Sequence, residues 1–135
     1  MTLKLLSMIP AAAVSDREAT LALSERGTRS AIVAGQVEGV ATSSVQAIRL
    51  DDFVFRHGNH PPDFIKLDVE GHGGAAIAGG FEVFRARRCR LLCEIHHEAE
   101  LEAVTAPLGA LGYRLTAVGR GRRNPRHIVL TPPPG

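Results

Sequence analysis

The sequence has few of the features that mark specialised classes of protein. It has two cysteines and no tryptophan in 135 residues, so a disulfide-rich secreted domain is excluded. No stretch approaches the roughly 18 consecutive apolar residues of a membrane-spanning helix. The apolar N-terminal stretch is short and interrupted by Ser7 and Pro10, unlike a secretory signal peptide. We therefore expect a cytoplasmic protein that has no membrane partner.

The charge of the chain is nearly balanced. Lys and Arg number 16 and Asp and Glu number 14, which gives a net charge of +2. The basic residues form no long run of the kind that binds nucleic acid, so we do not expect a nucleic-acid partner. Arg120, Arg122, Arg123 and Arg126 gather near a predicted hairpin tip. They could bind an acidic substrate, but solvated arginines are common at such tips.

The two cysteines, Cys89 and Cys93, lie four residues apart in CRLLC. On a strand, this spacing puts both side chains on one face, about 13 Å apart. That is too far for a disulfide, and two cysteines without further ligands make a poor zinc site. We interpret them as small buried hydrophobic residues.

The length and the 44% hydrophobic content predict one modest core, and we treat residues 1–135 as a single domain. The first part of the chain has weak patterns: a short buried strand over residues 9–14, weak alternation over 19–23, and a Gly-, Ser- and Thr-rich surface excursion over 24–44. Alternation returns over residues 45–50, and Asp51 and Asp52 can cap a short helix over 53–56.

The patterns become clear from residue 63 onward. An apolar strand over 64–69 precedes a helix of roughly 14 residues, and a second strand over 90–95 precedes a helix over 98–111. In that helix an apolar stripe opposes three glutamates. The stripe is Leu101, Val104, Leu108 and Leu111, and the glutamates are Glu98, Glu100 and Glu102. Strands over 113–118 and 127–131 complete an α/β fold with a mostly parallel sheet and an antiparallel C-terminal hairpin.

Polar side chains follow the two strands that we expect to be parallel neighbours. Asp68, Glu70 and His72 follow the first strand, and Glu94 and His96 end the second. Ligands of open parallel sheets bind beyond these strand ends. The carboxylates there could orient a hydroxyl or amine, accept its proton, or hold a divalent cation.

Individual residues of this group also have alternative interpretations. His96 could act as the general base, because imidazole accepts protons near neutral pH. Asp68 and Glu94 could instead cap helices or pair with basic residues. Lys66 is either a partner of the acidic group or a side chain that extends outward. The Gly-rich residues 71–80 contain no phosphate-loop motif, and we interpret them as small residues for close helix–sheet packing.

Several segments resemble FkbM-type methyltransferases. Residues 62–71 (PDFIKLDVEG) are similar to the motif that this family has at the fourth strand of the class I methyltransferase sheet. Further similar segments occur in order along the chain. They are residues 12–16 (AAVSD), 50–53 (LDDF), Gly79, 91–96 (LLCEIH) and 112–113 (GY).

The resemblance implies transfer of a methyl group from S-adenosylmethionine to a hydroxyl of a sugar, a polyketide or a similar small molecule. By position, Asp68, Glu70 and His96 would be the catalytic residues, with Asp68 also beside the cofactor. Glu94, Lys66 and His72 would contact the substrate. No metal ligands are assigned, although the cation alternative stays open.

Two departures from the family pattern qualify this implication. His72 and Gly73 follow Gly71, where the family commonly has a small or aromatic residue and then glutamate. The glycine-rich cofactor turn and the acidic residue after the second strand do not precede Ile9. We therefore expect a partial, N-terminally truncated Rossmann-like domain without its first two strands.

In such a domain the strand over 63–68 would have an exposed edge. Self-association or a partner chain would cover it. Two other functions stay open, a non-catalytic remnant that acts as an interaction module, and a metal-dependent hydrolase built on the acidic group.

Overall fold

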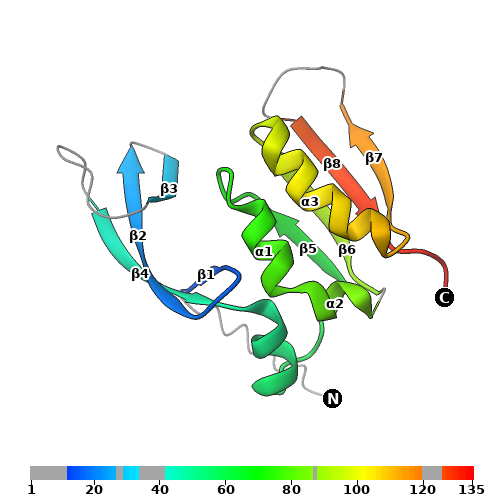
Figure 1. Cartoon of the computed structure of the whole chain (residues 1–135), viewed down its shortest axis with the longest axis horizontal. Coiled ribbons are helices and arrows are strands. Elements are labelled where there is room, and N and C mark those ends of the chain that lie inside the picture. Colours follow the sequence, from blue (N-terminus) through cyan, green and yellow to red (C-terminus); the bar gives the residue numbers. More distant parts are fainter. Residues whose placement is uncertain (1–11, 27–28, 34–41, 87, 120–125) are drawn as a thin grey trace, which may run out of the picture.

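The computed structural model describes residues 12–26, 29–33, 42–86, 88–119 and 126–135. They form two four-stranded sheets that lie side by side (Figure 1). The strands of the first sheet are, in spatial order, β1 (Ala12–Val14), β4 (Thr42–Ile48), β2 (Ala19–Arg26) and β3 (Arg29–Val33). No helix in these ranges is long and apolar enough to cross a membrane.

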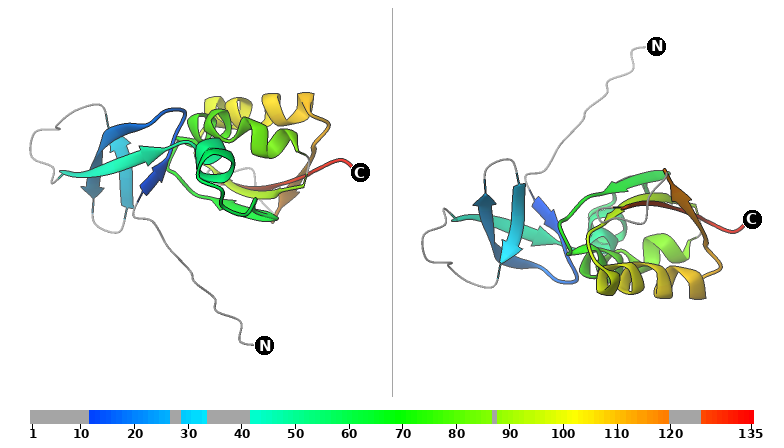
Figure 2. Two further views of the ribbon diagram at one scale, coloured as in Figure 1. Left: turned by 90° about the horizontal axis from the view of Figure 1, so that it is seen from below. Right: turned by 90° about the horizontal axis from the view of Figure 1, so that it is seen from above.

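The second sheet contains the C-terminal strands. Their spatial order is β5 (Phe64–Leu67), β6 (Arg90–Ile95), β8 (Arg126–Thr131) and β7 (Arg114–Val118). Three helices lie against one face of this sheet (Figure 2). They are α1 (Gly73–Gly79), α2 (Phe81–Arg85) and α3 (Glu98–Ala110).

The core lies between the second sheet and its helices. Side chains alternate along β6, where Leu91, Cys93 and Ile95 are fully buried and Glu94 is only partly buried. From α3, Val104 and Leu108 join the same cluster. This alternation is the period-two pattern of a strand with one covered face.

The α/β class is confirmed, but the expected mostly parallel sheet is not observed. Each of the two sheets has one parallel pair and two antiparallel pairs. In the second sheet, β8 lies between β6 and β7 and runs antiparallel to both. The stretch between Val118 and Arg126 is too short for the crossover that parallel neighbours need. The C-terminal hairpin is confirmed.

The prediction of a surface excursion over residues 24–44 is wrong for the described part of that segment. Strand β2 continues to Arg26, β3 pairs with it antiparallel, and β4 begins at Thr42. Backbone ladders form this sheet, and such ladders need no strong hydrophobic alternation. Residues 34–41 lie outside the described ranges.

The helix expected after Gly71 is two helices. Helix α1 ends at Gly79 and α2 begins at Phe81, because two adjacent glycines are weak helix formers. The carboxylate of Asp51 then accepts hydrogen bonds from the backbone N–H groups of Glu82 (3.2 Å) and Val83 (3.0 Å). These bonds satisfy the first donors of α2.

The prediction that Asp51 caps the short helix over residues 53–56 is wrong. Asp51 makes no capping bond to the helical turn η1 (Asp52–Arg56). This turn has π-type geometry, in which the N–H of His57 donates to the carbonyl of Asp52 at 2.9 Å. Asp51 is buried and turns toward α2 instead.

The interpretation of the two cysteines is confirmed. Both are free and fully buried. Burial raises the pKa of Cys89 to about 11, and burial together with the negative charge of Glu100 raises that of Cys93 to about 12.

At pH 8 we expect both thiols of the folded chain to react with Ellman's reagent at least ~100-fold more slowly than in urea. Fast release of either thiol without urea would contradict this prediction.

The same shifts predict a loss of stability at alkaline pH. In the unfolded chain a cysteine titrates near 9.0, whereas in the folded chain Cys93 keeps its proton up to about 12. The stability that this buried thiol contributes is complete below pH 9 and is lost as the pH rises toward 12. We expect the urea midpoint to fall over this range, and to fall less in the Cys93→Ala variant.

Candidate functional site

The predicted polar residues converge at the carboxyl ends of β5 and β6, which are adjacent and parallel (Figure 1). His96 directly follows β6, and Asp68 directly follows β5. The Nε2 atom of His96 lies 3.9 Å from Asp68 Oδ1 and 3.3 Å from Glu70 Oε2. The parallel pairing therefore brings together the three residues that we assigned as catalytic.

Glu94 joins this group from inside β6. Its Oε1 lies 3.7 Å from His96 Nε2, and its Oε2 lies 3.7 Å from Nε2 of His127 on β8. We call Asp68, Glu70, Glu94 and His96 the acidic cluster. Three carboxylates thus surround one imidazole nitrogen, an arrangement that can hold a cation or a proton donor.

A tight turn positions Glu70. The φ angles of Glu70 and Gly71 are 47° and 91°, and the N–H of His72 donates to the carbonyl of Val69 at 3.0 Å. These values match a type I′ turn, which needs positive φ at both central positions. Glu70 is the only non-glycine residue of the described ranges with positive φ, so the turn holds this carboxylate in place at an energetic cost.

We expect Glu70→Asn to stabilise the chain by about 1 kcal/mol, because asparagine tolerates positive φ better than glutamate. The substitution also removes one of several adjacent negative charges. Urea denaturation at pH 7 measures the change. Glu102→Asn, at an exposed position of α3, serves as the control and is expected to lower stability slightly. A loss of stability in Glu70→Asn would contradict the strain assigned to this turn.

Glu100 is the residue of the site that the sequence analysis missed. We placed it on the exposed face of its helix, but it is only 2% exposed. Its Oε1 lies 3.6 Å from His96 Nδ1, and neither carboxylate oxygen accepts a hydrogen bond. The pattern could have revealed this position, because Glu100, Val104 and Leu108 recur every four residues and so share one helix face.

The two remaining predicted substrate residues lie at the margin of the group. Lys66 is exposed on β5 and forms no ion pair with the acidic cluster in the part of the chain that is described. His72 bonds elsewhere, since its Nε2 lies 3.0 Å from Ser15 Oγ in the turn after β1. Its contact therefore joins the two sheets, and the substrate roles of both residues stay predictions.

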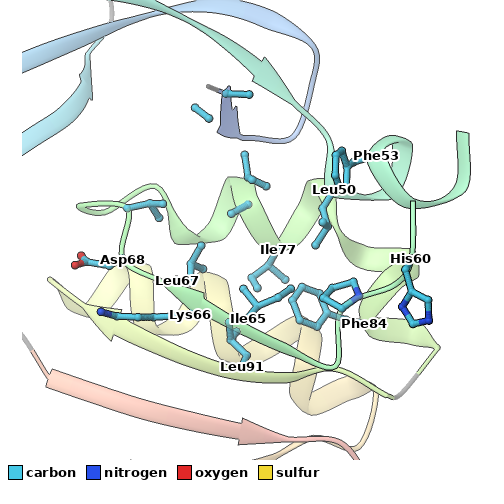
Figure 3. A pocket seen from close by; sticks show the side chains of 16 residues that line it. Leu50, Phe53, His60, Ile65, Lys66, Leu67, Asp68, Ile77, Phe84 and Leu91 are labelled. Carbon is cyan, nitrogen blue, oxygen red and sulfur yellow. The ribbon is translucent and has the colours of Figure 1, made fainter. Parts of the chain in front are cut away.

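A cavity of about 500 Å³ lies beside β5 (Figure 3). Its walls come from β1, β5 and α1 and are mainly apolar, with Val14, Ile65 and Ile77 among them. Asp68 lies at one end of it and His60 at the other. Asp68 thus belongs both to the acidic cluster and to the rim of the cavity.

The glycines after the turn allow close packing, as expected, but against different partners. A Cβ at Gly79 would lie 1.8 Å from the backbone oxygen of Ser15. A Cβ at Gly73 would lie 2.9 Å from Val104, and one at Gly74 would lie 2.7 Å from Ala103. The small residues therefore bring α1 close to α3 and to the turn after β1, rather than to the sheet.

Of the four arginines noted in the sequence, only Arg126 lies in the described ranges. Its guanidinium bonds the exposed carboxylate of Glu98. Arg120, Arg122 and Arg123 lie outside these ranges, so their role stays a prediction.

The comparison with protein families shows to which family the chain belongs. Residues 8–115 match the model of the methyltransferase FkbM domain. The chain belongs to this family. A crystal structure of methyltransferase FkbM from Methylobacillus flagellatus has a similar fold, with a TM-score of 0.60 and 14% sequence identity. The similarity covers 88% of this chain and 27% of that one. No curated protein matches the sequence.

Two motif segments of this FkbM domain now have structural explanations. The LDDF segment contributes Asp51, which caps α2. The glycine after DVEG is Gly79, where α1 touches the turn after β1. These two positions support the fold rather than the acidic cluster. The acidic and histidine side chains of the DVEG and EIH segments, in contrast, form the cluster.

Proposed function

We propose that the chain forms the acceptor side of an S-adenosylmethionine-dependent O-methyltransferase. The observation that supports this proposal is that His96 Nε2 lies within 3.9 Å of both Asp68 and Glu70, and that Asp68 lies at the end of an apolar cavity. The acceptor that we propose is a hydroxyl of a small molecule or a sugar. We further propose that the chain corresponds to the later strands of a class I, Rossmann-like sheet.

The residues of the cavity fit part of the proposed cofactor. Ligand cavities commonly measure about 300 to 1,000 Å³ and have mainly apolar walls with a few polar groups. This cavity, at about 500 Å³, has walls suited to an apolar or aromatic group. Asp68 at its rim supplies a carboxylate for a positive charge. Asp68 is therefore the residue that we expect to contact the cofactor.

The acidic cluster would then activate the acceptor. The bound cofactor supplies a methyl group on positively charged sulfur. Glu70 and Glu94 can accept hydrogen bonds from the acceptor and hold its hydroxyl in line with that methyl group. His96 Nε2 would take the proton of the acceptor hydroxyl, and the nearby carboxylates would stabilise the resulting imidazolium. A bound cofactor would give the methyl group to the acceptor oxygen and keep the carbon–sulfur electron pair, so charge and atoms would balance.

Isothermal titration of the full chain with S-adenosylmethionine tests this proposal. We expect micromolar binding, and we expect Val14→Trp to weaken it at least ~10-fold by filling the cavity, a loss of about 1.4 kcal/mol. Val118→Trp is the matched control, because Val118 is exposed and lies outside the cavity wall. Absence of binding by the folded chain, or equal effects of the two substitutions, would contradict the proposal.

A second function is supported by the free edge of β5. Within the described ranges this strand pairs only with β6, and Phe64 on it is 54% exposed. An unpaired strand edge can add a strand from another chain. The alternative is therefore a non-catalytic interaction module, with a second copy of this chain as the partner.

Sedimentation velocity over a range of concentrations tests this alternative. A concentration-dependent dimer that Phe64→Lys abolishes would support it, because a charged edge resists pairing. Phe55→Lys is the control, since Phe55 is equally exposed but lies on η1. A monomer at all concentrations would contradict self-association.

A cytoplasmic location, and the expectation that neither nucleic acid nor a membrane is a partner, stay predictions.

A further inference from the structure

We propose that Asp68, Glu70 and His96 bind one divalent metal ion, with Mn²⁺ and Zn²⁺ as the ions that fit best. One oxygen from each carboxylate and Nε2 of the imidazole would be the ligands. Glu94 would lie beside these ligands without bonding the ion. The binding itself does not depend on the proposed methyl transfer.

The distances within the cluster suit a single ion. The three ligand atoms lie within 4.8 Å of one another, and Nε2 lies 3.3 Å from Glu70 and 3.9 Å from Asp68. Two atoms that each bond a metal at about 2.1 Å lie roughly 3 to 4.2 Å apart, depending on the coordination angle. The ligand atoms therefore need to move by only a small amount to bind one ion.

Within the described ranges, the basic side chains that contact the carboxylates of the cluster are two imidazoles, those of His96 and His127. Asp68, Glu70 and Glu94 surround His96, and Glu100 lies behind it. Within the described ranges, neither lysine nor arginine forms an ion pair with any of these four carboxylates, since the arginine pairs there involve other acids. Adjacent carboxylates without a counter-charge repel one another, and a divalent cation would remove that repulsion.

Glu100 provides the independent observation that points to a metal. Its side chain is completely buried, and neither oxygen accepts a hydrogen bond. Burying an unpaired carboxylate is costly. This carboxylate points at His96 Nδ1, which is also buried without a hydrogen-bond partner, at 3.6 Å.

This arrangement is the one that metal-binding histidines use. Such a histidine bonds the metal through one ring nitrogen and donates the N–H of the other to a carboxylate or carbonyl. An ion on Nε2 would fix the proton on Nδ1, and Glu100 would then accept it. A small approach of the two groups would satisfy His96 Nδ1 and Glu100 Oε1, two of the three unpartnered atoms of this pair. A bound metal would thus account for the presence of a glutamate in the core at this position.

The ligand set also indicates the class of ion. Carboxylates suit Mg²⁺ and Mn²⁺, whereas imidazole suits Zn²⁺ and other transition metals. A site with both kinds of ligand favours Mn²⁺ and Zn²⁺ over Mg²⁺. Three protein ligands would leave coordination positions open, as in metal sites that bind substrate.

One further step rests on the proposed function. An acceptor hydroxyl in an open position would bond the ion directly, and the ion would make that hydroxyl a stronger acid. His96 would then act as a ligand, and Glu94 would take the proton. The metal would therefore replace the imidazole as the activating group.

Titration of the full chain with Mn²⁺, followed by electron paramagnetic resonance of the free ion, tests the site. We expect one bound Mn²⁺ per chain, displaced by Zn²⁺ at lower concentration than by Mg²⁺. Glu70→Gln and His96→Ala should each weaken binding at least ~10-fold. Glu100→Gln should weaken Mn²⁺ binding by ~10- to 100-fold, because the carboxylate beside His96 Nδ1 would be lost.

The controls separate this site from surface binding and from misfolding. Glu102→Gln changes an exposed glutamate of the same helix and should leave Mn²⁺ binding unchanged. Circular dichroism checks that each variant is folded. A folded chain that leaves the Mn²⁺ signal unchanged, or binding that Glu70→Gln and His96→Ala do not weaken, would overturn the proposal. No methyl donor is used, so this result is independent of the S-adenosylmethionine titration.

Discussion

Replacement of Gly79 by alanine is expected to lower the free energy of unfolding by about 3 kcal/mol. The added methyl group would lie 1.8 Å from the backbone oxygen of Ser15, and backbone atoms cannot move aside as a flexible side chain can. To relieve this overlap, the turn after β1 must separate from α1. That movement would strain the hydrogen bond from Ser15 N–H to the carbonyl of Ile48 (2.9 Å) and the contact between Ser15 Oγ and His72 Nε2 (3.0 Å).

Urea denaturation followed by circular dichroism measures this loss. Gly109→Ala is the matched control, because Gly109 lies in α3 and nothing lies within 4 Å of an added Cβ there. We expect this control to gain about 0.5 to 1 kcal/mol from the higher helix propensity of alanine. If the two variants had equal stability, the close contact at Gly79 would not contribute to the fold.

Replacement of Asp51 by alanine is expected to cost about 2 kcal/mol. Its carboxylate accepts two backbone N–H groups at the start of α2, and loss of a helix cap costs about 0.5 to 2 kcal/mol. The hydrogen bond from Val83 N–H to this carboxylate is buried. Without Asp51, the N–H of Val83 would have no partner there, which adds a desolvation penalty. Arg49, 3.6 Å away, would also lose one of its two acidic partners.

The adjacent residue provides the comparison for this substitution. Asp52 carries the same charge and also contacts Arg49, at 3.7 Å, but it caps no helix. We therefore expect Asp52→Ala to change the free energy of unfolding by less than about 0.5 kcal/mol. Thermal melts of both variants at pH 7 measure the difference. A similar loss in both would mean that charge, rather than capping, explains the effect.

Much of the second sheet and of the site could be predicted from the sequence. The strand over residues 90–95 and the helix that follows it have strong periodicities, and the structure places them as β6 and α3. The proximity of Asp68, Glu70 and His96 follows from one parallel pairing, because adjacent parallel strands end at the same edge. The order and direction of these two strands are therefore enough to predict that the three side chains lie together, without knowledge of the side-chain packing.

The parts that could not be predicted depend on contacts between distant segments. Asp51 reaches α2, 31 residues along the chain, and no local pattern specifies that partner. The sequence places Glu100 with the other glutamates opposite the apolar stripe, and burial of a charged residue is uncommon, so its burial beside Val104 is not predicted. The first sheet is held by strand pairing in segments with weak alternation, so its hydrophobic pattern is not informative.

Asp68 is shared by two parts of the molecule. Its carboxylate lines the rim of the apolar cavity and also contacts His96 within the acidic cluster. A positively charged occupant of the cavity and a cation in the cluster would draw on the same negative charge. Each would then lower the affinity for the other, and thermodynamic reciprocity requires the factor to be the same in both directions. One side chain would thus couple the two proposed sites without any change in backbone conformation.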